Sequence, residues 1–363
     1  MVYNVIGLMS GSSLDGLDIV FVELTEVRGA WSYMIQASEC IPYSEKWKED
    51  LKTAIDMNAR DYMLLHTAYG HYTGEQVKAF IGRHQLEHRV HFIASHGHTT
   101  FHMPQSRMTA QLGDGAAIAA VTGLPVISDL RAMDVALGGQ GAPIVPIGEQ
   151  LLFAGYDYWL NLGGIANLSA KNGETFRAFD ICPANRVLDA LAAALGKNYD
   201  ENGALASGGV TDNALLEALN SQPYYKQSFP KSLANDFGTD VILPLIGQYT
   251  LSVQGKLRTY VEHIAQQVAA GVQQVSGEET TGKKLLITGG GAFNRFLVLQ
   301  LQDRLEPMGI TVIVADEQTA AYKEALVMAL IGALRWRQQP NVLASVTGAS
   351  RDSVNGTLWL GEG

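Results

Sequence analysis

Three glycine-rich turns, each preceded by a short apolar segment, carry the residues most able to do chemistry in this chain. They lie at 7–18 (GLMSGSSLDGLD), 161–169 (NLGGIANLS) and 287–294 (ITGGGAFN). A turn without bulky side chains lets backbone N–H groups approach and hold a phosphate. One such turn is also compatible with an ordinary tight turn, but three, spread over both halves of the chain, predict a nucleotide held between two domains.

The first turn adds hydroxyl and carboxylate side chains to its glycines. Ser10, Ser12 and Ser13 supply N–H donors and hydroxyls, and Asp15 and Asp18 follow them. These residues fit a phosphate-binding hairpin with a carboxylate near a metal, and they fit a polar β-turn equally well. The turn is not a Walker A loop, because no Gly-Lys-Ser/Thr follows it, and not a dinucleotide fingerprint, because a strand comes next.

The third turn and a single carboxylate extend the candidate site into the second half. Residues 289–291 are three glycines between a predicted strand and a predicted helix, and we interpret them as a seat for an adenosine; a plain strand-to-helix turn is the alternative. Asp180 ends another predicted strand and is a candidate general base. Helix capping is the alternative for Asp180, although Asn185 is better placed for that role.

Six histidines do not predict a metal centre, although they stand close together in the sequence. No nearby Cys or Glu completes a ligand set around His96 and His98. We expect most of the six to be surface and loop residues. His96 is the exception, because it ends a predicted strand. The other positions are 84, 88, 91 and 102.

Two similar series of elements are expected to position these turns. In the first half we expect strands at 2–8, 17–24, 31–41, 90–95 and 125–128 and helices at 44–57, 61–84 and 114–122. In the second half we expect strands at 158–162, 166–170, 175–179, 283–288 and 310–314 and helices at 185–195, 247–275, 292–305 and 323–335. Residues 138–146, rich in Gly and Pro, should form a loop or hinge. The repeated order predicts a duplicated α/β domain with a ligand in the cleft between the copies.

The composition excludes several classes of protein. The 363 residues favour two domains, and 47% hydrophobic with 17% charged residues is typical of a soluble globular protein. No apolar run reaches the roughly 18 residues that span a bilayer, and no signal peptide is visible at the N-terminus. The net charge of −10 argues against nucleic-acid binding. Cys40 and Cys182, the two cysteines, fit a reducing compartment.

On these residues the chain resembles the anhydro-N-acetylmuramic acid kinases, a branch of the actin/sugar-kinase/Hsp70-like ATPases, over nearly its full length. Besides the three turns, the resemblance rests on further strings in a fixed order: SHGHTTFHMP (95–104), SDLRAMDVALGGQGAPIVP (128–146), FDICPAN (179–185), DENGALASG (200–208), PKS (230–232), KEA (323–325) and VTGA (346–349).

The resemblance implies a fold and a reaction. The fold is two ribonuclease-H-like (actin-like ATPase) domains, residues 1–135 and 136–363, with an interdomain active-site cleft; the C-terminal end is a candidate to pack back on the first domain. The reaction is that of a cytoplasmic enzyme of cell-wall recycling, which uses ATP, Mg²⁺ and water to open the 1,6-anhydro ring of 1,6-anhydro-N-acetylmuramic acid, giving N-acetylmuramic acid 6-phosphate. The partner is then a small molecule, and a homodimer is left open.

The motifs and the resemblance together give the candidate site. Asp180 is the expected catalytic base, and Asp15 is the expected metal ligand. The residues expected to bind ATP are Gly11, Ser12, Ser13, Leu14, Asp15, Gly16, Leu17, Asp18, Gly163, Gly164, Gly289, Gly290 and Gly291. Those expected at the sugar are His96, Arg131, Asp134, Asn185 and Glu324.

The chain departs from the family pattern at three places. Residues 180–185 read DICPAN where the family reads Asp-Thr-Gly-Pro-Gly-Asn, His98 stands where Gln is common, and 233–235 read LAN where Thr-Gly-Arg is common. Because the Asp and the ATP motifs are kept, we predict a working kinase. The alternatives are a kinase of another amino sugar or of an ordinary sugar hydroxyl, a sugar-binding homologue without turnover, and an ATP-driven conformational module of the Hsp70 or actin type.

Overall fold

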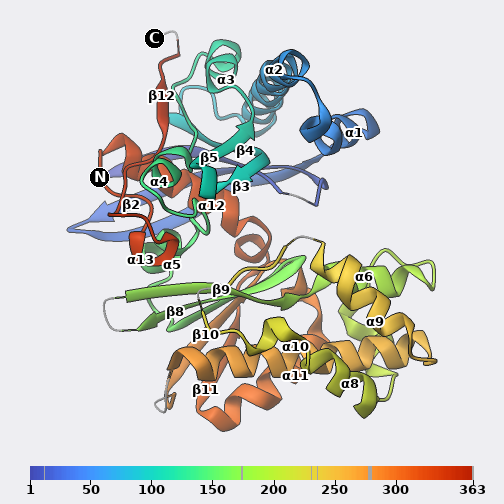
Figure 1. Cartoon of the computed structure of the whole chain (residues 1–363). Helices are drawn as coiled ribbons and strands as arrows, with labels where there is room; N and C mark the ends of the chain where they lie inside the picture. The colour runs from blue at the N-terminus through green and yellow to red at the C-terminus, as the bar shows by residue number, and fades with distance from the viewer. Residues whose placement is uncertain (12, 173–174, 230, 235, 277–279, 362–363) are drawn as a thin grey trace. The chain divides into compact units, whose positions relative to one another are not determined.

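The chain folds into two compact units, each built on its own β-sheet (Figure 1). The computed structural model describes residues 1–11, 13–172, 175–229, 231–234, 236–276 and 280–361. The first unit comprises Met1–Ala154 and Tyr322–Gly363, and the second comprises Gly155–Ala321. These units are defined by contacts within the chain, and the domain boundary expected after residue 135 stays a prediction.

The sheet of the first unit has the strand order β12-β6-β4-β1-β2-β3, with β5 beside β4. The strands β1, β2 and β3 form an antiparallel meander, β4 runs parallel to β1, and β6 runs parallel to β4. Their bounds are β1 (Val2–Ser10), β2 (Gly16–Val27), β3 (Ala30–Pro42), β4 (Phe92–Met103), β5 (Met108–Leu112), β6 (Val126–Ser128) and β12 (Thr357–Trp359).

The sheet of the second unit repeats this topology. Its order is β11-β10-β7-β8-β9, in which β7, β8 and β9 form an antiparallel meander, β10 is parallel to β7 and β11 is parallel to β10. The bounds are β7 (Tyr158–Leu162), β8 (Ile165–Asn172), β9 (Thr175–Pro183), β10 (Lys283–Thr288) and β11 (Ile310–Val314). The repeated order confirms the predicted duplicated α/β fold of the ribonuclease-H-like class.

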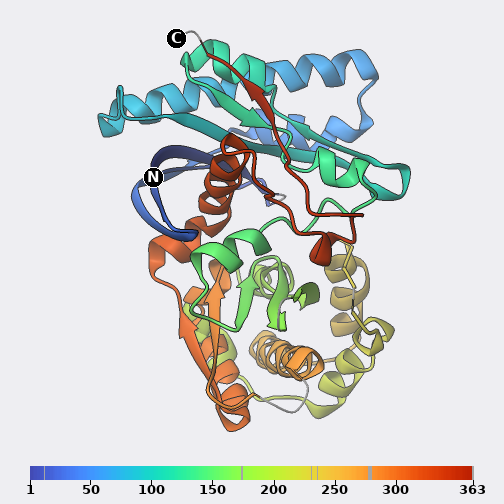
Figure 2. The same ribbon diagram turned by 90° about the vertical axis from the view of Figure 1, so that its left-hand side faces the viewer.

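Helices cover both faces of the first sheet (Figures 1 and 2). The long helix α2 begins after Asn58, whose side chain accepts a hydrogen bond from the N–H of Asp61, and it ends where Gln85 turns left-handed. Within the described ranges, no helix combines the length and apolar character of a membrane span. The helices of this unit are α1 (Glu45–Thr53), α2 (Ala59–His84), α3 (Gly115–Thr122), α4 (Ala132–Ala136), α5 (Pro146–Leu152), α13 (Ala344–Thr347) and most of α12 (Glu317–Trp336).

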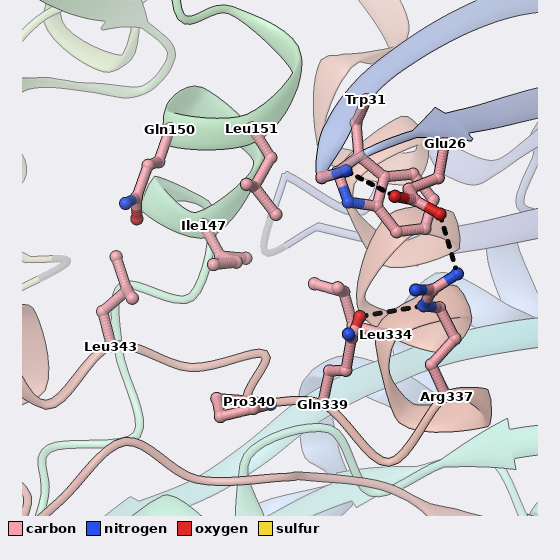
Figure 3. A pocket seen from close by; sticks show the side chains of 11 residues that line it. Glu26, Trp31, Ile147, Gln150, Leu151, Leu334, Arg337, Gln339, Pro340 and Leu343 are labelled. Atoms are coloured by element: carbon pink, nitrogen blue, oxygen red, sulfur yellow. Dashed lines mark hydrogen bonds and ion pairs between the residues drawn. The ribbon is translucent and has the colours of Figure 1, made fainter.

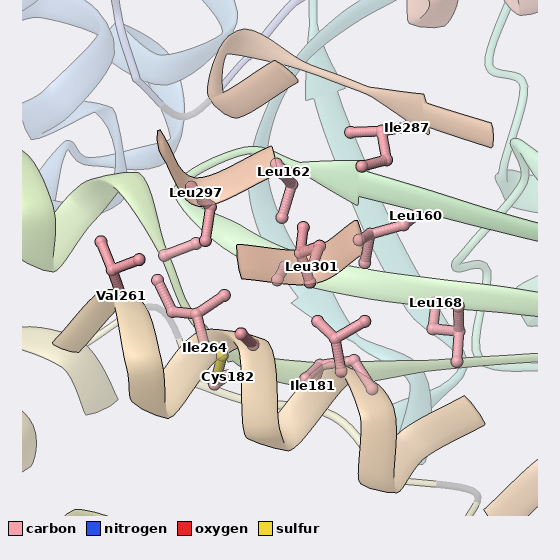
Figure 4. Close-up of a cluster of buried hydrophobic side chains, with 14 of the residues drawn as sticks. Leu160, Leu162, Leu168, Ile181, Cys182, Val261, Ile264, Ile287, Leu297 and Leu301 are labelled. Carbon is pink, nitrogen blue, oxygen red and sulfur yellow. The ribbon is translucent and has the colours of Figure 1, made fainter. Parts of the chain in front are cut away.

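The core of the second unit lies between its sheet and α10 and α11, as Figure 4 shows. Leu160, Leu168 and Ile181 come from the strands, and Ile264 and Leu301 come from the helices. The helical stretches expected at 247–275 are confirmed from residue 253 on, where α10 starts; residue 247 is the end of the separate helix α9. The bounds are α6 (Asn185–Ala193), α7 (Ala204–Ser207), α8 (Asn213–Asn220), α9 (Leu243–Gly247), α10 (Val253–Ser276) and α11 (Arg295–Leu305).

Gly7 allows α12 to pack directly on β1. The neighbours Ile6 and Leu8 alternate to the other face of the sheet, where they join the core that includes α2. A Cβ at Gly7 would lie 2.0 Å from the carbonyl oxygen of Ala325 and 3.0 Å from the Cβ of Ala329. The absence of a side chain at this position is therefore a condition for the packing of α12.

We predict opposite effects for two glycine-to-alanine changes in the first unit. Gly7→Ala should lower the free energy of unfolding by about 1–3 kcal/mol, since backbone must move to make room. Gly82→Ala should raise it by about 0.5–1 kcal/mol, because this helical glycine has open space around its Cβ position. Urea unfolding measures both values. Equal stability of the two variants would contradict the packing of α12 described here.

Candidate active site

The first glycine-rich turn connects two strands, as predicted, and is tightly folded. Residues 11–15 join β1 to β2. The N–H of Leu14 donates to the carbonyl oxygen of Gly11 at 3.4 Å, and Leu14 takes a left-handed conformation with φ 59°. Ser12, which the sequence assigns to this loop, lies outside the described residues. The described residues on either side of Ser12 thus form a short connection between two antiparallel strands.

The loop exposes its polar side chains, and the chain becomes buried where β2 begins. Ser13 and Asp15 are exposed, whereas Gly16 and Leu17 are buried. A Cβ at Gly16 would lie 2.4 Å from the carbonyl oxygen of Ile41, so this glycine permits the close pairing of β2 with β3. Any side-chain contact with a ligand in this stretch therefore belongs to the exposed part.

Asp18 follows on β2 as a partly buried carboxylate. Burial raises its pKa to about 6; a hydrogen bond from Cys40 lowers it, and the nearby charges of Glu324 and Asp15 raise it further. Cys40 lies opposite Asp18 on β3, and burial together with this carboxylate raises the pKa of its thiol to about 12. In the part of the chain that the structure describes, no three or more His, Cys, Asp or Glu side chains are grouped to hold a metal ion.

His96, which is buried, and Arg131, which is partly buried, form a hydrogen-bonded pair in the first unit. Nε of Arg131 donates to Nε2 of His96 at 2.8 Å, and one guanidinium nitrogen donates to the carbonyl oxygen of Gly141 at 2.7 Å. Because a guanidinium can only donate, Nε2 of His96 accepts, and its Nδ1 carries the proton toward the carbonyl oxygen of Gly97, 2.8 Å away. Burial, and then the charge of Arg131, lower the pKa of His96 to about 3.

Asp134 is fully buried, and both its carboxylate oxygens are used within the first unit. One accepts from the N–H of Gly141 at 2.8 Å, and the other accepts from the hydroxyl of Thr347 at 2.7 Å. Its own N–H donates to the side chain of Asn355 at 3.0 Å. Asp134 thereby ties the loop after α4 to the C-terminal segment. Sequence reasoning missed Asn355, but the VTGA string contained Thr347.

Asp180 lies near the end of β9 in the second unit, opposite Asn167. One carboxylate oxygen accepts from the N–H of Leu233 at 2.8 Å. Its N–H donates to the carbonyl oxygen of Lys231 at 3.2 Å, and its carbonyl oxygen accepts from the hydroxyl of Tyr224 at 2.7 Å. Burial raises the pKa of Asp180, which the bond from Leu233 partly offsets. The residue is therefore a fixed, partly desolvated carboxylate.

The second glycine turn contacts the start of α6. The N–H groups of Ala184 and Asn185 donate to the carbonyl oxygens of Gly164 and Gly163 at 2.8 and 3.1 Å, and Nδ2 of Asn185 donates to the carbonyl oxygen of Leu162 at 3.0 Å. The capping role suggested for Asn185 is wrong, because α6 begins at Asn185 and its N-cap is Ala184. The side chain of Asn185 instead fixes the end of β7.

The third glycine turn lies against the same strand end. A Cβ at Gly289 would lie 2.7 Å from Oδ1 of Asn161, and a Cβ at Gly291 would lie 2.6 Å from that of Leu162. A Cβ at Gly290 would meet only an amide nitrogen at 3.6 Å. Two of the three glycines are thus explained by packing within the second unit, and Gly290 is not.

The prediction of surface histidines holds for some positions and is wrong for His98. His88, His91 and His102 are exposed, whereas His98 is 6% exposed. The strand β4 runs on to Met103, so His96 lies inside it and not at its end. The polar residues 95–103 (SHGHTTFHM) gave no sign in the sequence that the strand continues through them. They are part of β4 because they pair with the neighbouring strands β1 and β5.

A pocket of about 510 Å³ lies elsewhere in the first unit (Figure 3). Its charged groups pair with one another: Glu26 accepts from Arg337 at 3.1 Å, and Arg337 donates to Gln339 at 2.9 Å beside the ring of Trp31. None of the predicted site residues lines it. The lining residues are Glu26, Gly29, Trp31, Ile147, Gln150, Leu151, Leu334, Arg337, Gln339, Pro340 and Leu343.

The comparisons with known proteins give one family. The model of the family described as "Anhydro-N-acetylmuramic acid kinase" matches residues 3–361. The chain belongs to the anhydro-N-acetylmuramic acid kinase family. Curated relatives of that name from Vibrio parahaemolyticus and Salinibacter ruber are each 33% identical to it, over 98% of this chain and 97% and 96% of theirs.

A solved structure also resembles the chain at low similarity. It is the activator of the 2-hydroxyisocaproyl-CoA dehydratase from Clostridium difficile with bound ADPNP, at 16% identity and a TM-score of 0.44, covering 93% of this chain and 97% of that one. The placement of this chain in the anhydro-N-acetylmuramic acid kinase family rests on the family model and the curated relatives.

We predict that His96 makes the stability of the first unit pH-dependent. Its pKa is about 3 in the folded chain and about 6.5 when unfolded, so the unfolded state binds more protons between these values and stability falls as the pH falls below about 6.5. Replacing it by Gln should remove about 2 kcal/mol of the loss in unfolding free energy between about pH 7 and pH 5.

Urea unfolding at the two pH values measures this difference. The exposed residue His71, replaced by Gln, provides the matched control and should leave the pH dependence unchanged. An unchanged pH dependence in the His96→Gln variant would show that His96 is not held neutral.

Proposed function

We propose that this chain is an ATP-dependent kinase that opens the ring of 1,6-anhydro-N-acetylmuramic acid and phosphorylates its 6-oxygen. The products are N-acetylmuramic acid 6-phosphate and ADP, and the setting is peptidoglycan recycling in the cytoplasm. The observation that carries the proposal is Asp180, a desolvated carboxylate fixed by Leu233, Lys231 and Tyr224. The name of the curated relatives supports the choice of sugar.

The proposed reaction balances with Asp180 as the base. Asp180 takes a proton from water, the water oxygen bonds to the anomeric carbon, and the bond from this carbon to the 6-oxygen breaks. The 6-oxygen takes the γ-phosphoryl group of ATP, and ADP leaves. This is the task of the base in an inverting glycosidase, with phosphoryl transfer in place of the proton from a general acid. Because burial raises its pKa, Asp180 is a stronger base than an exposed aspartate.

We assign the phosphates of ATP to the loop at 11–15 and its adenosine to the turn at Gly290. A Cβ at Gly290 would make only an ordinary contact, 3.6 Å from the side-chain nitrogen of Asn185, so packing within the protein gives no reason for the missing side chain, which supports this assignment. We assign Mg²⁺ to the exposed carboxylate of Asp15; burial, and then the charges of Glu324 and Asp15, raise the pKa of the nearby Asp18, and a bound cation would favour the ionised form of Asp18. Bound Mg²⁺ would offset charge on the transferred phosphoryl group. That these parts meet in a cleft stays a prediction.

On the sugar side we propose two kinds of role. Arg131 and Glu324 are only partly buried, and we assign them to contacts with the substrate, beside His96. Asp134 has both oxygens occupied by Gly141 and Thr347, so we assign it the positioning of the loop that follows α4.

A coupled assay for ADP release tests the function directly. The chain with ATP and Mg²⁺ should turn over 1,6-anhydro-N-acetylmuramic acid and leave intact N-acetylmuramic acid untouched. Asp180→Asn should fold normally and lose about 10²–10⁴-fold in turnover, the range for loss of a general base. Asp303→Asn, at an exposed position on α11, is the control and should keep full activity. Near-full activity of a folded Asp180→Asn variant would refute the assignment.

Substitutions at two neighbouring glycines distinguish a role in nucleotide binding from a role in packing. Gly290→Val should weaken ATP binding by at least about tenfold while the melting temperature changes little, because the protein leaves space there and the added methyl groups would meet the nucleotide. Gly291→Ala should lower the melting temperature instead, since its Cβ would lie 2.6 Å from that of Leu162. Calorimetric titration with ATP and thermal unfolding measure the two effects. Unchanged ATP affinity of Gly290→Val would make this turn purely structural.

A further inference from the structure

Four buried polar side chains form a chain of hydrogen bonds at the base of the loop at 11–15. The hydroxyl of Tyr43 donates to Oγ of Ser10 at 2.8 Å and also bonds the hydroxyl of Tyr69. Oγ of Ser10 lies 3.0 Å from Nδ1 of His98. These side chains come from β1, β4, α2 and the residue that follows β3. Ser10 belongs to the first glycine-rich turn, but none of the four is among the residues expected to bind ATP or the sugar.

The direction of the bonds follows from the number of protons available. Tyr43 has one hydroxyl proton and gives it to Ser10, so the hydroxyl of Tyr69 must donate to Tyr43. Ser10 keeps its own proton, and in the arrangement that we infer it donates this proton to Nδ1 of His98, 3.0 Å away. The neutral imidazole of His98 then carries its proton on Nε2. Burial lowers the pKa of His98 to about 4, in agreement with this state.

Burial makes these bonds hard to replace by water. Ser10 is 3% exposed, Tyr43 4%, Tyr69 1% and His98 6%. A buried polar group that loses its partner keeps the cost of leaving water. Removing one hydroxyl from this chain of bonds therefore leaves its neighbour without a partner.

Tyr43 contacts both ends of the loop. Its hydroxyl bonds the side chain of Ser10, the last residue before the loop, and its backbone N–H donates to the carbonyl oxygen of Asp15 at 3.4 Å. His98 lies opposite Ser10 in the register of β1 and β4. The ends of the loop are thus fixed from one side by Tyr43, and its first end is also fixed by His98.

We propose that Tyr43, Ser10 and His98 are positioning residues that hold the 11–15 loop in the conformation that binds the phosphates of ATP. The inference rests on the proposed function and extends it to residues outside the loop. It also explains how His98 can stand where Gln is common in the family, because Nδ1 of a neutral imidazole and Oε1 of an amide are both acceptors for Ser10.

A pair of tyrosine variants tests the proposal. Tyr43→Phe keeps the ring and removes the hydroxyl, and we expect KM for ATP and the calorimetric Kd for ADP to rise about 3–10-fold, with a smaller change in kcat. Tyr72→Phe is the matched control, because its ring packs against Tyr43 and Tyr69 while its hydroxyl takes no part in the hydrogen-bonded chain. Equal nucleotide affinity of the two variants would overturn the proposal.

Two variants at His98 give an independent test. This test can be carried out even if the Tyr43→Phe variant does not fold. His98→Gln supplies the amide acceptor and should keep the nucleotide affinity of the parent chain, whereas His98→Leu should lose it by about 3–10-fold. ¹⁵N NMR should show Nδ1 of His98 as the unprotonated nitrogen. Equal affinity of His98→Gln and His98→Leu, or a protonated Nδ1, would overturn the inference.

The readouts separate this inference from the proposed function. ADP binding needs no sugar and no turnover, so a chain that binds ADP but does not consume the anhydro sugar would refute the substrate while the Tyr43 comparison remains decisive. If the parent chain turns over the sugar normally and the Tyr43→Phe and Tyr72→Phe variants have equal nucleotide affinity, only the positioning role is refuted. A parent chain that binds no nucleotide would refute both.

Discussion

Parallel pairing of the first strand in each sheet is the constraint on which both parts of the candidate site depend. β4 is parallel to β1 and β10 is parallel to β7, so the carboxyl ends of each pair lie at the same edge of their sheet. In the first unit this places Ser10 opposite His98, and in the second it places Thr288 opposite Asn161. Each glycine-rich turn begins directly after such a strand end, so the register of the sheet fixes its position.

A second feature of the first unit is that several of its polar groups are buried and paired. Asp134 uses both carboxylate oxygens, His96 is held by Arg131, and Ser10 is held by two partners. Because an unpaired buried polar group is costly, such pairs resist local rearrangement. In contrast, Asp15 and Gly290 are exposed. The paired groups thus hold their own segments in place, whereas the exposed Asp15 and Gly290 remain accessible to a ligand.

The sequence predicted the meanders and the strand–helix alternation, because long apolar runs and glycine turns leave few alternatives. It did not predict the bond between Asp134 and Thr347, since no local pattern links residues 213 positions apart in the chain. The sequence predicted His98 at the surface, because the polar residues of a strand that is paired on both sides have the composition of a loop. The short helices between 204 and 247 were missed, since they have few turns and depend on packing, that of α7 and α8 on α10 and that of α9 on α8.

The unusual DICPAN segment raises the question of whether the departure from the family pattern costs chemistry. Ile181, Cys182 and Ala184 are all buried, and none of them adds a polar group beside Asp180. Ile181 occupies space that Gly271 of α10 leaves free, where a Cβ would lie 2.4 Å from the end of the isoleucine. The N–H of Ala184 still donates to the carbonyl oxygen of Gly164 at 2.8 Å, without a glycine at this position. The larger side chains therefore enter the hydrophobic core behind the segment, and the support of the Asp180 carboxylate comes from Leu233 on another part of the chain. A change of packing in this segment is thus compatible with an unchanged base.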